Sequence, residues 1–168
     1  SVFLSGPNPQ WAFQDALAGH MRAQATIVSQ SGYMANVGLI QSIADEGTPV
    51  YVDMIAHASL WAGIHAANAT ARPFRHNDMA HLRRQLHKYG PGVVIIDSVY
   101  STNGSIAPIV EVVDLAEEYG CVIVVDESHS LGTHGPEGAG LVVEFGLQHR
   151  VHFRTASLAK TFCGRGGI

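Results

Sequence analysis

Two runs of consecutive apolar residues, each ending in an aspartate, constrain the fold most strongly. Val93-Val-Ile-Ile is followed by Asp97, and Cys121-Val-Ile-Val-Val is followed by Asp126. Neither run alternates with polar residues, which indicates strands that are buried on both faces. An aspartate at the end of such a strand lies at the rim of a sheet with little water around it. Because burial favours the neutral form of a carboxyl group, we expect a cationic partner beside Asp126.

Segments typical of helices and of strands alternate along the rest of the chain, with short connections. Helices are predicted over 9–22, 34–44, 59–69, 78–88, 108–119 and 141–145, and strands over 25–29, 50–53, 71–74, 93–97, 121–125 and 151–155. This alternation predicts an α/β fold with a mostly parallel, twisted sheet and helices on both faces. The length of 168 residues suits one well-packed domain, which we expect to span 1–168.

Composition argues against several classes of partner. Hydrophobic residues make up 46% of the chain and charged residues only 14%, so we expect part of the surface to be covered. The net charge of −4 and the lack of a basic patch in the sequence disfavour nucleic acid and anionic membranes. The longest apolar runs are far shorter than a membrane span. Two cysteines without a disulfide-like pattern predict a reducing, cytoplasmic location.

Polar residues gather where the predicted strands end. These ends carry residues 31–32, 53–57, 97–101, 126–129 and 157–160. The carboxyl ends of parallel strands meet at one edge of the sheet, and ligands bind in the crevice beyond that edge. The sequence therefore predicts one binding site that is built from these stretches.

Lys160 stands just past the last predicted strand, in Ser157-Leu-Ala-Lys160. Its neighbours are small or apolar, so we expect the side chain to be partly desolvated, which favours a neutral and nucleophilic amine. Such lysines form Schiff bases with carbonyl compounds, pyridoxal phosphate among them. The alternative is a lysine that tethers a loop through a surface contact.

A pyridoxal cofactor would provide the cation that Asp126 requires, because its pyridine nitrogen is held by a carboxylate. His129 could hydrogen-bond the phenolic oxygen of the same cofactor, and His57 could lay its ring over an aromatic ligand. The alternatives are a capping role for the aspartate, a hydrogen-bonded loop position for His129 and a structural position for His57.

The cofactor phosphate would need backbone N–H groups at the start of a helix. Ser31-Gly32-Tyr33 precedes a predicted helix and offers such groups, and Ser157 can add a hydroxyl. Ordinary helix capping by the Ser-Gly pair is the alternative.

A zinc site and a nucleotide-binding loop fit the sequence less well. Asp126-Glu-Ser-His129 lies at a strand exit and lacks the helical His-Glu-x-x-His spacing of zinc hydrolases, and the histidines are scattered along the sequence. The glycine-rich segment Gly135-Pro-Glu-Gly-Ala-Gly140 does not directly follow a predicted strand, and its proline removes an N–H donor. We therefore expect no metal site.

Five motifs follow one another along the chain. They are Ser31-Gly32-Tyr33-x-Ala35-Asn36, Asp53 to His57-Ala-Ser59, Ser98-Val-Tyr-Ser101 with Gly104 and Ala107-Pro108, Asp126-Glu-Ser-His129-Ser-Leu-Gly132, and Ser157-x-x-Lys160. Their order resembles the α-oxoamine synthases, which are fold-type I pyridoxal-phosphate enzymes, and the resemblance covers nearly the whole chain. The segments 29–32, 126–136 and 155–162 are most similar to the branch of this family that makes quorum-sensing autoinducers.

The resemblance implies the large domain of a pyridoxal-phosphate transferase. It implies a decarboxylative condensation of an amino acid or aminoacyl donor with an acyl-CoA, here of medium chain length, to give an α-aminoketone that leads to a signal molecule. It also implies a cytoplasmic homodimer with active sites at the subunit interface. We expect the sequence to be part of a longer enzyme whose N-terminal segment and C-terminal small domain lie outside it, together with the arginine that binds the substrate carboxylate.

Carried over residue by residue, the resemblance implies four catalytic positions. Lys160 is the Schiff-base lysine and a proton shuttle. Asp126 pairs with the pyridine nitrogen, and His129 holds the phenolic oxygen. His57 stacks on the cofactor ring.

Four further positions are implied to bind the cofactor. Ser101 lies near the ring substituents, and Gly32, Tyr33 and Ser157 serve the phosphate. Ser128 departs from the wider family pattern, in which a small apolar residue often lies beneath the ring, so no role follows for it.

Two alternatives stay open on the sequence alone. Another branch of the family would make an aminoketone for biotin, haem, threonine breakdown or sphingoid bases, because no residue in the sequence determines the acyl length or the amino donor. A truncated, non-catalytic paralogue would act only as a dimerisation partner, as expected if 168 residues were the full product.

Overall fold

Five parallel strands form one sheet in the computed structural model, which describes residues 8–168. The strands are β1 (Pro49–Asp53), β2 (Thr70–Phe74), β3 (Val93–Asp97), β4 (Val122–Asp126) and β5 (Phe153–Thr155), in the spatial order β2-β1-β3-β4-β5. The predicted α/β fold with a parallel sheet is confirmed. The predicted domain, 1–168, includes residues 1–7, which lie outside the described part.

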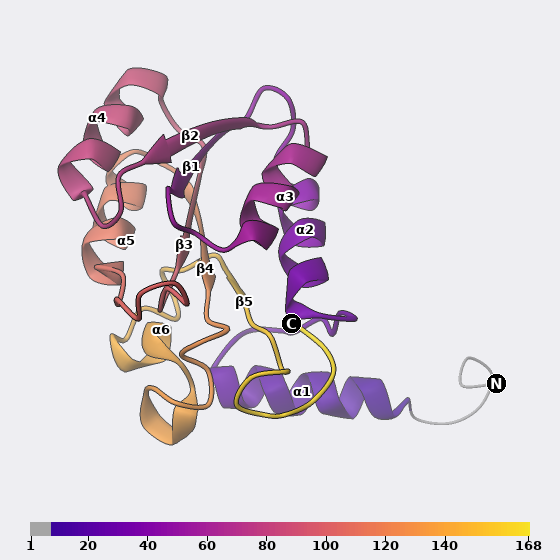
Figure 1. Cartoon of the computed structure of the whole chain (residues 1–168). Helices are drawn as coiled ribbons and strands as arrows, with labels where there is room; N and C mark the ends of the chain where they lie inside the picture. The colour runs from indigo at the N-terminus through magenta and orange to yellow at the C-terminus, as the bar shows by residue number, and fades with distance from the viewer. Residues whose placement is uncertain (1–7) are drawn as a thin grey trace.

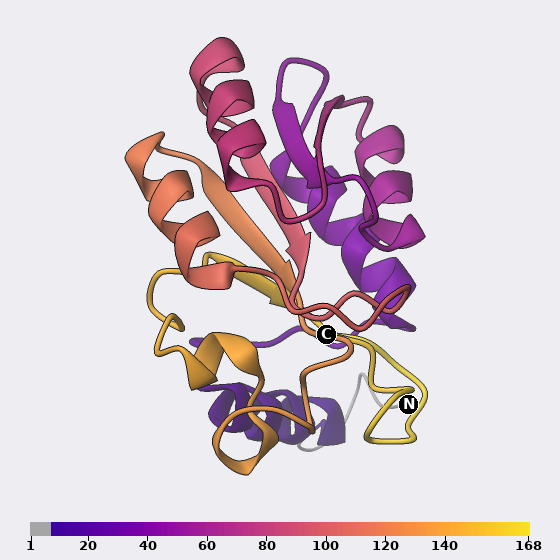
Figure 2. The same cartoon turned by 60° about the vertical axis from the view of Figure 1, so that its left-hand side comes forward.

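The strand order reverses direction between β1 and β3. The chain passes from β1 outward to β2, then returns across β1 to β3 and continues through β4 to β5 (Figures 1 and 2). Such a reversal leaves a crevice at the carboxyl ends of the two central strands, where α/β sheets bind their ligands.

Helices cover both faces of the sheet, as predicted. They are α1 (Pro9–Met21), α2 (Gly32–Ile43), α3 (Ala58–Ala66), α4 (Met79–Tyr89), α5 (Ile109–Glu118) and the short α6 (Leu141–Glu144), with a 3-10 turn η1 (Pro136–Gly138). Helices α4 and α5 lie on one face, and α2 and α3 lie on the other (Figure 1).

The apolar runs are buried because each strand contributes side chains to two hydrophobic cores, one on each face of the sheet. In β3, Val94 and Ile96 pack in the core that includes Leu82 of α4, whereas Ile95 packs in the core that includes Ile40 of α2. Successive side chains of a strand point to opposite faces, so a sheet covered on both sides requires every position to be apolar. This explains the missing polar alternation in the sequence.

The predicted strand over residues 25–29 was wrong. This segment lies outside the sheet, and only Ser29 forms an isolated antiparallel bridge, with Gly167. Ile27 is 80% exposed, and the half-buried Val28 packs beside α1 and the C-terminal segment rather than in the two cores of the sheet. The bridge nevertheless ties the chain that precedes α2 to the chain that follows β5.

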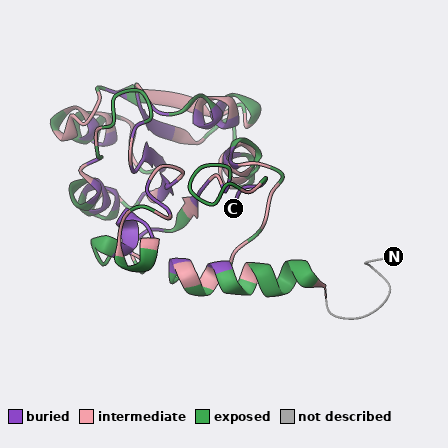
Figure 3. Ribbon diagram, turned by 60° about the horizontal axis from the view of Figure 1, so that its bottom comes forward, coloured by how far each residue is buried: buried purple, intermediate pink, exposed green. Residues whose placement is uncertain are grey.

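Helix α1 forms where the apolar spacing predicts it, but it buries only its C-terminal half. Leu17 and Met21 are buried, whereas Trp11 and Phe13 are exposed. The N-terminal half of the helix is coloured mostly as exposed (Figure 3). Within residues 8–168, no helix has the length and apolar character needed to cross a membrane.

Candidate active site

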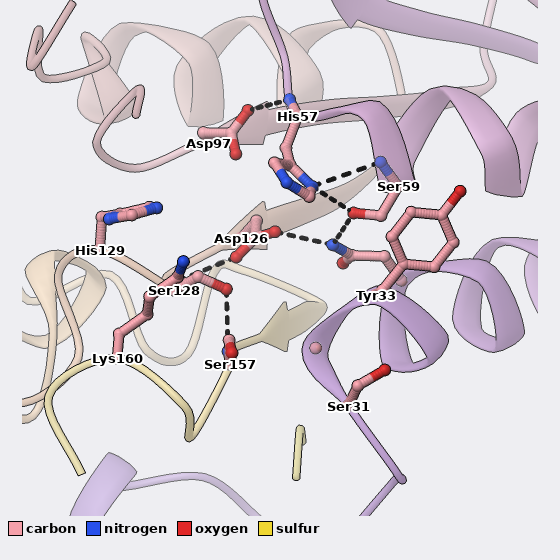
Figure 4. A pocket seen from close by; sticks show the side chains of 12 residues that line it. Ser31, Tyr33, His57, Ser59, Asp97, Asp126, Ser128, His129, Ser157 and Lys160 are labelled. Carbon is pink, nitrogen blue, oxygen red and sulfur yellow. Dashed lines mark hydrogen bonds between the residues drawn. The ribbon is translucent and has the colours of Figure 1, made fainter. Parts of the chain in front are cut away.

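A cavity of about 200 Å³ opens at the carboxyl edge of the sheet. Its lining comes from the strand ends and from the first turns of α2 and α3 (Figure 4): Ser31, Gly32, Tyr33, Asn36, His57, Ser59, Asp97, Asp126, Ser128, His129, Ser157 and Lys160. All the site residues predicted from the sequence are in this set except Ser101, which lies in an exposed turn after β3. The single binding site that the sequence predicts at the strand ends is therefore present as a cavity.

Asp126 ends β4 at the floor of the cavity and is 3% exposed. Its Oδ1 accepts the Ser128 N–H at 2.8 Å, and its Oδ2 accepts Asn36 Nδ2 at 2.7 Å. Both donors are neutral. Among the ion pairs formed within residues 8–168, none includes Asp126, so its expected cationic partner is not a side chain of this part of the protein.

Asp97 stands beside Asp126, because the two residues are paired in register on β3 and β4. Its Oδ2 accepts the backbone N–H of His57 at 2.9 Å. Burial, reinforced by the negative charge of Asp126, raises the pKa of Asp97 to about 8. Near neutral pH the carboxyl group of Asp97 is therefore mostly protonated.

His57 is held from two sides at the start of α3, where it is the N-cap. Its backbone N–H is bonded to Asp97, and its ring Nδ1 lies 2.7 Å from Ser59 Oγ and 3.3 Å from the Ser59 N–H (Figure 4). His57 is exposed, and its imidazole ring, fixed by these hydrogen bonds, borders the cavity.

His129 and Lys160 border the cavity on the side of the β4 and β5 exits (Figure 4). Burial, and next the positive charge of Lys160, lower the pKa of His129, so this ring is neutral near neutral pH. Lys160 itself is exposed, and the expected desolvation of its amine was wrong for this part of the chain. The physical reason is that residues 159–163 form a turn whose residues are all exposed.

Gly32 brings the start of α2 against the exit of β5. A Cβ at this position would lie only 2.7 Å from Ser157 Cβ, so glycine is required for this approach. Ser31 caps the helix by accepting the Met34 N–H at 3.1 Å, and Tyr33 stands half exposed beside it.

Ser128, for which the sequence offered no role, connects the exits of β4 and β5. Its Oγ accepts the Ser157 N–H at 2.8 Å, while its own N–H is bonded to Asp126. The Ser157 N–H is therefore already used within the protein, and its hydroxyl remains the group that borders the cavity.

Sequence reasoning missed Asn36 and Ser59, although both occur in the motifs quoted above. The signal was present in α2, where the buried positions Gly32, Asn36 and Ile40 recur every four residues. An asparagine on the inward stripe of a helix needs buried polar partners, which marks it as part of a site.

The described residues contain no group of three or more His, Cys, Asp or Glu side chains placed to hold a metal ion.

A sequence family described as aminotransferase class I and II matches residues 1–168. The chain belongs to this family. Among family members, it is 52% identical over 167 residues to the CAI-1 autoinducer synthase of Vibrio campbellii, which covers 99% of this chain and 42% of that protein. It is 37% identical over 163 residues to the 8-amino-7-oxononanoate synthase of Acidithiobacillus ferrooxidans, with coverage of 95% and 42%. The chain thus spans less than half the length of these relatives.

Solved structures of serine palmitoyltransferases have the same fold. The serine palmitoyltransferase of Sphingomonas wittichii matches with a TM-score of 0.90 at 33% identity, over 98% of this chain and 42% of that one. A serine palmitoyltransferase from S. paucimobilis with a bound PLP–myriocin aldimine matches with a TM-score of 0.87 at 35% identity, over 92% and 39%. These relatives are α-oxoamine synthases, so the resemblance predicted from the five motifs is confirmed.

Proposed function

We propose that the full-length protein is a pyridoxal-phosphate-dependent acyltransferase of the α-oxoamine synthase type. The observation that carries this proposal is the carboxylate of Asp126, which is buried at the cavity floor and receives only neutral donors. A buried charge requires a partner of opposite sign. The pyridinium nitrogen of pyridoxal phosphate is such a partner, and the solved relative with bound PLP supports the same cofactor here.

The phosphate end of the cofactor fits the opposite corner of the cavity. The first N–H groups of α2 are unpaired by the helix itself, and the dipole of the helix favours an anion there. Gly32 lets the start of α2 lie directly against Ser157, because a Cβ at this position would lie 2.7 Å from Ser157 Cβ. Tyr33 borders the same corner.

When bound, the cofactor supplies an electron sink for carbanion chemistry at the amino-acid Cα. Lys160 anchors it through Nζ and carries protons at that atom, while the neutral His129 donates a hydrogen bond to its phenolic oxygen. His57 lies against the ring because its backbone and Nδ1 are both held. Ser101 lies outside the cavity lining, so its place near the ring substituents stays a prediction.

The proposed reaction condenses an amino acid or aminoacyl donor with an acyl-CoA, releasing CO2 and CoA to give an α-aminoketone. The 52% identity to an autoinducer synthase, against 37% to an 8-amino-7-oxononanoate synthase, favours a medium-chain acyl-CoA and a quorum-sensing signal precursor. A screen of acyl-CoA chain lengths, followed by CoA release, tests this substrate class. A preference outside the medium chain lengths would favour another branch of the family.

We also propose a homodimer whose interface covers the open side of the cavity. Tyr33, Met34 and Phe162 are large apolar side chains that stand exposed in α2 and beside Lys160. Light scattering of the full-length protein is expected to give twice the mass of one chain, and a stable monomer would contradict this proposal.

The free thiols of Cys121 and Cys163 are consistent with the predicted cytoplasmic location.

The decisive test is the visible absorption band of the lysine-bound cofactor. The full-length protein incubated with pyridoxal phosphate is expected to keep this band after dialysis, and Lys160→Ala is expected to lose it. Lys88→Ala, which removes a lysine of α4 outside the cavity lining, is the matched control and keeps the band. A wild-type protein without the band would refute the enzyme proposal and favour a non-catalytic paralogue.

A further inference from the structure

Asn36 joins four elements of the site through a single side-chain amide. It lies in α2, is 2% exposed, and makes all its side-chain hydrogen bonds to residues far along the chain. Its Nδ2 donates to Asp126 Oδ2 at 2.7 Å and to Ser59 Oγ at 2.8 Å, and its Oδ1 accepts Thr155 Oγ1 at 2.6 Å. The amide thus connects α2 with the start of α3 and with the ends of β4 and β5.

The chemistry of these partners determines which way the amide points. An ionised carboxylate can only accept hydrogen bonds, so the atom that faces Asp126 must be the nitrogen. The second hydrogen of Nδ2 then goes to Ser59, and Oδ1 is left to accept from Thr155. A flipped amide would set Oδ1 against the carboxylate, where two acceptors would face each other with no hydrogen between them, which costs free energy.

The same hydrogen-bond direction continues to His57. Ser59 Oγ accepts from Asn36, so its single hydrogen is free to be donated to His57 Nδ1 at 2.7 Å. The backbone N–H of Ser59 also points at Nδ1, at 3.3 Å. Because Nδ1 accepts from both groups, the proton of the neutral imidazole resides on Nε2.

We propose that Asn36 is a positioning residue that orients the carboxylate of Asp126 and, through Ser59, sets His57 in its Nε2–H tautomer. One amide thereby fixes the orientation of two groups: the Asp126 carboxylate, which would pair with the cofactor nitrogen, and the His57 imidazole, which would lie against the cofactor ring. The positioning role rests on the proposed function, because it assumes that the cofactor binds here. The His57 tautomer does not depend on the cofactor. The two can therefore fail separately.

The first experiment reads the tautomer without relying on activity. Long-range proton–nitrogen NMR spectra of the full-length protein with labelled histidines, with His57 assigned through His57→Gln, are expected to show Nε2 protonated and Nδ1 bare. In Asn36→Asp the new carboxylate accepts the Ser59 hydroxyl hydrogen, so Ser59 Oγ must accept from Nδ1–H and the tautomer reverses. An unchanged His57 tautomer in Asn36→Asp would overturn the proposal, as would an Nδ1–H tautomer in the wild type.

Two further variants keep the test decisive if Asn36→Asp does not fold. Ser59→Ala removes the hydroxyl relay and leaves only the long backbone contact to Nδ1, so a second tautomer is expected to become detectable, and its absence would overturn the relay. Gln41→Ala is the matched control, because it removes another bond between α2 and α3, from Gln41 Nε2 to the Ala66 carbonyl at 3.3 Å, at an exposed position. It should leave the His57 tautomer unchanged, and a change there would overturn the assignment to Asn36.

Cofactor affinity provides the second readout. Loss of a hydrogen bond to a charged group weakens binding about 10- to 100-fold, so Asn36→Ala, which removes the amide without adding a charge, should lower pyridoxal-phosphate affinity by about this factor in a fluorescence titration. Wild-type affinity in this variant would overturn the positioning role. A wild-type protein that binds no cofactor but shows the expected tautomers would refute the proposed function and leave the Asn36–Ser59–His57 relay intact.

Discussion

Asp126 and Glu127 are adjacent in the sequence and equally hidden from water, yet their carboxylates meet opposite surroundings. Glu127 Oε2 is paired with the guanidinium of Arg154, with Nε at 2.5 Å, and both side chains are almost fully buried. Its Oε1 accepts the Val142 N–H at 3.0 Å and the Ser130 hydroxyl at 3.1 Å. Asp126 receives two neutral donors and faces the cavity.

The difference separates a structural carboxylate from a functional one. Arg154 neutralises Glu127 and also donates to the carbonyls of Met21 and, at 2.7 Å, Ala139, so the ion pair joins α1 to the glycine-rich loop. Gly140 accommodates the pair closely, because a Cβ there would lie 2.4 Å from Glu127 Oε1. A buried carboxylate with its own protein cation holds the fold together, whereas one without such a cation is available to a bound group.

The largest effect is expected from Glu127→Gln, which leaves the buried guanidinium of Arg154 without its counter-charge. Breaking a buried ion pair costs about 3–5 kcal/mol, so the free energy of unfolding should fall by about that amount. Urea denaturation of the full-length protein measures it, with the exposed Glu137→Gln as control. A loss below about 1 kcal/mol, the scale of a surface ion pair, would show that Glu127 has no special structural role.

Asp126→Asn should show the opposite profile, with little loss of stability and a large loss of activity. The neutral amide no longer stabilises a cationic ring nitrogen, and removal of one such preorganised electrostatic contact costs about 100- to 1,000-fold in kcat. Some cofactor should still bind through the phosphate corner and Lys160. CoA release at saturating substrates measures kcat, and unchanged turnover would remove Asp126 from the proposed pyridinium contact.

Ser128→Ala should give a smaller change, because it removes only the acceptor of the Ser157 N–H. One neutral hydrogen bond contributes about 0.5–1.5 kcal/mol, which is the expected loss in unfolding free energy. The substitution also installs a small apolar residue, as is common in the wider family. Wild-type stability in thermal and urea denaturation would indicate that the connection between β4 and β5 exits does not depend on this hydroxyl.

A fourth prediction concerns the pH dependence of stability that Asp97 adds beside Asp126. The pKa of Asp97 is raised in the fold, so between the ordinary value near 3.8 and about 8 the native state holds a proton that the unfolded state has released. This contribution to stability is present at low pH and is lost as the pH rises through that window. Asp97→Asn should flatten the fall in melting temperature across the window, and an unchanged slope would contradict the raised pKa.

Sequence pattern predicted the parts of the molecule that depend on local periodicity. The strands around Val93 and Val122, the helix between them and the gathering of polar residues at the strand ends all follow from apolar spacing and parallel topology. The segment 25–29 failed because its residues have the apolar character of a strand but do not pair with any strand of the sheet.

The interior of the site could not be predicted in the same way. Lys160 was expected to be desolvated from its small neighbours in sequence, but exposure depends on which distant element covers the turn. The partners of Asn36 and Ser59, and the choice of Arg154 as the cation for Glu127, likewise arise between residues that no periodicity relates. A charge pattern shows that a carboxylate needs a partner, and only the fold shows which partner it has.

The bonds of Asn36 carry a consequence for how the cavity comes to exist. They close chain segments of 90 residues, to Asp126, and 119 residues, to Thr155. The entropy lost on closing a flexible loop rises with the logarithm of its length, so two or three hydrogen bonds cannot compensate for closing such spans in an otherwise unfolded chain. The cavity therefore forms only on a sheet that is already assembled, and its geometry is inherited from strand pairing across most of the polypeptide rather than from any local segment.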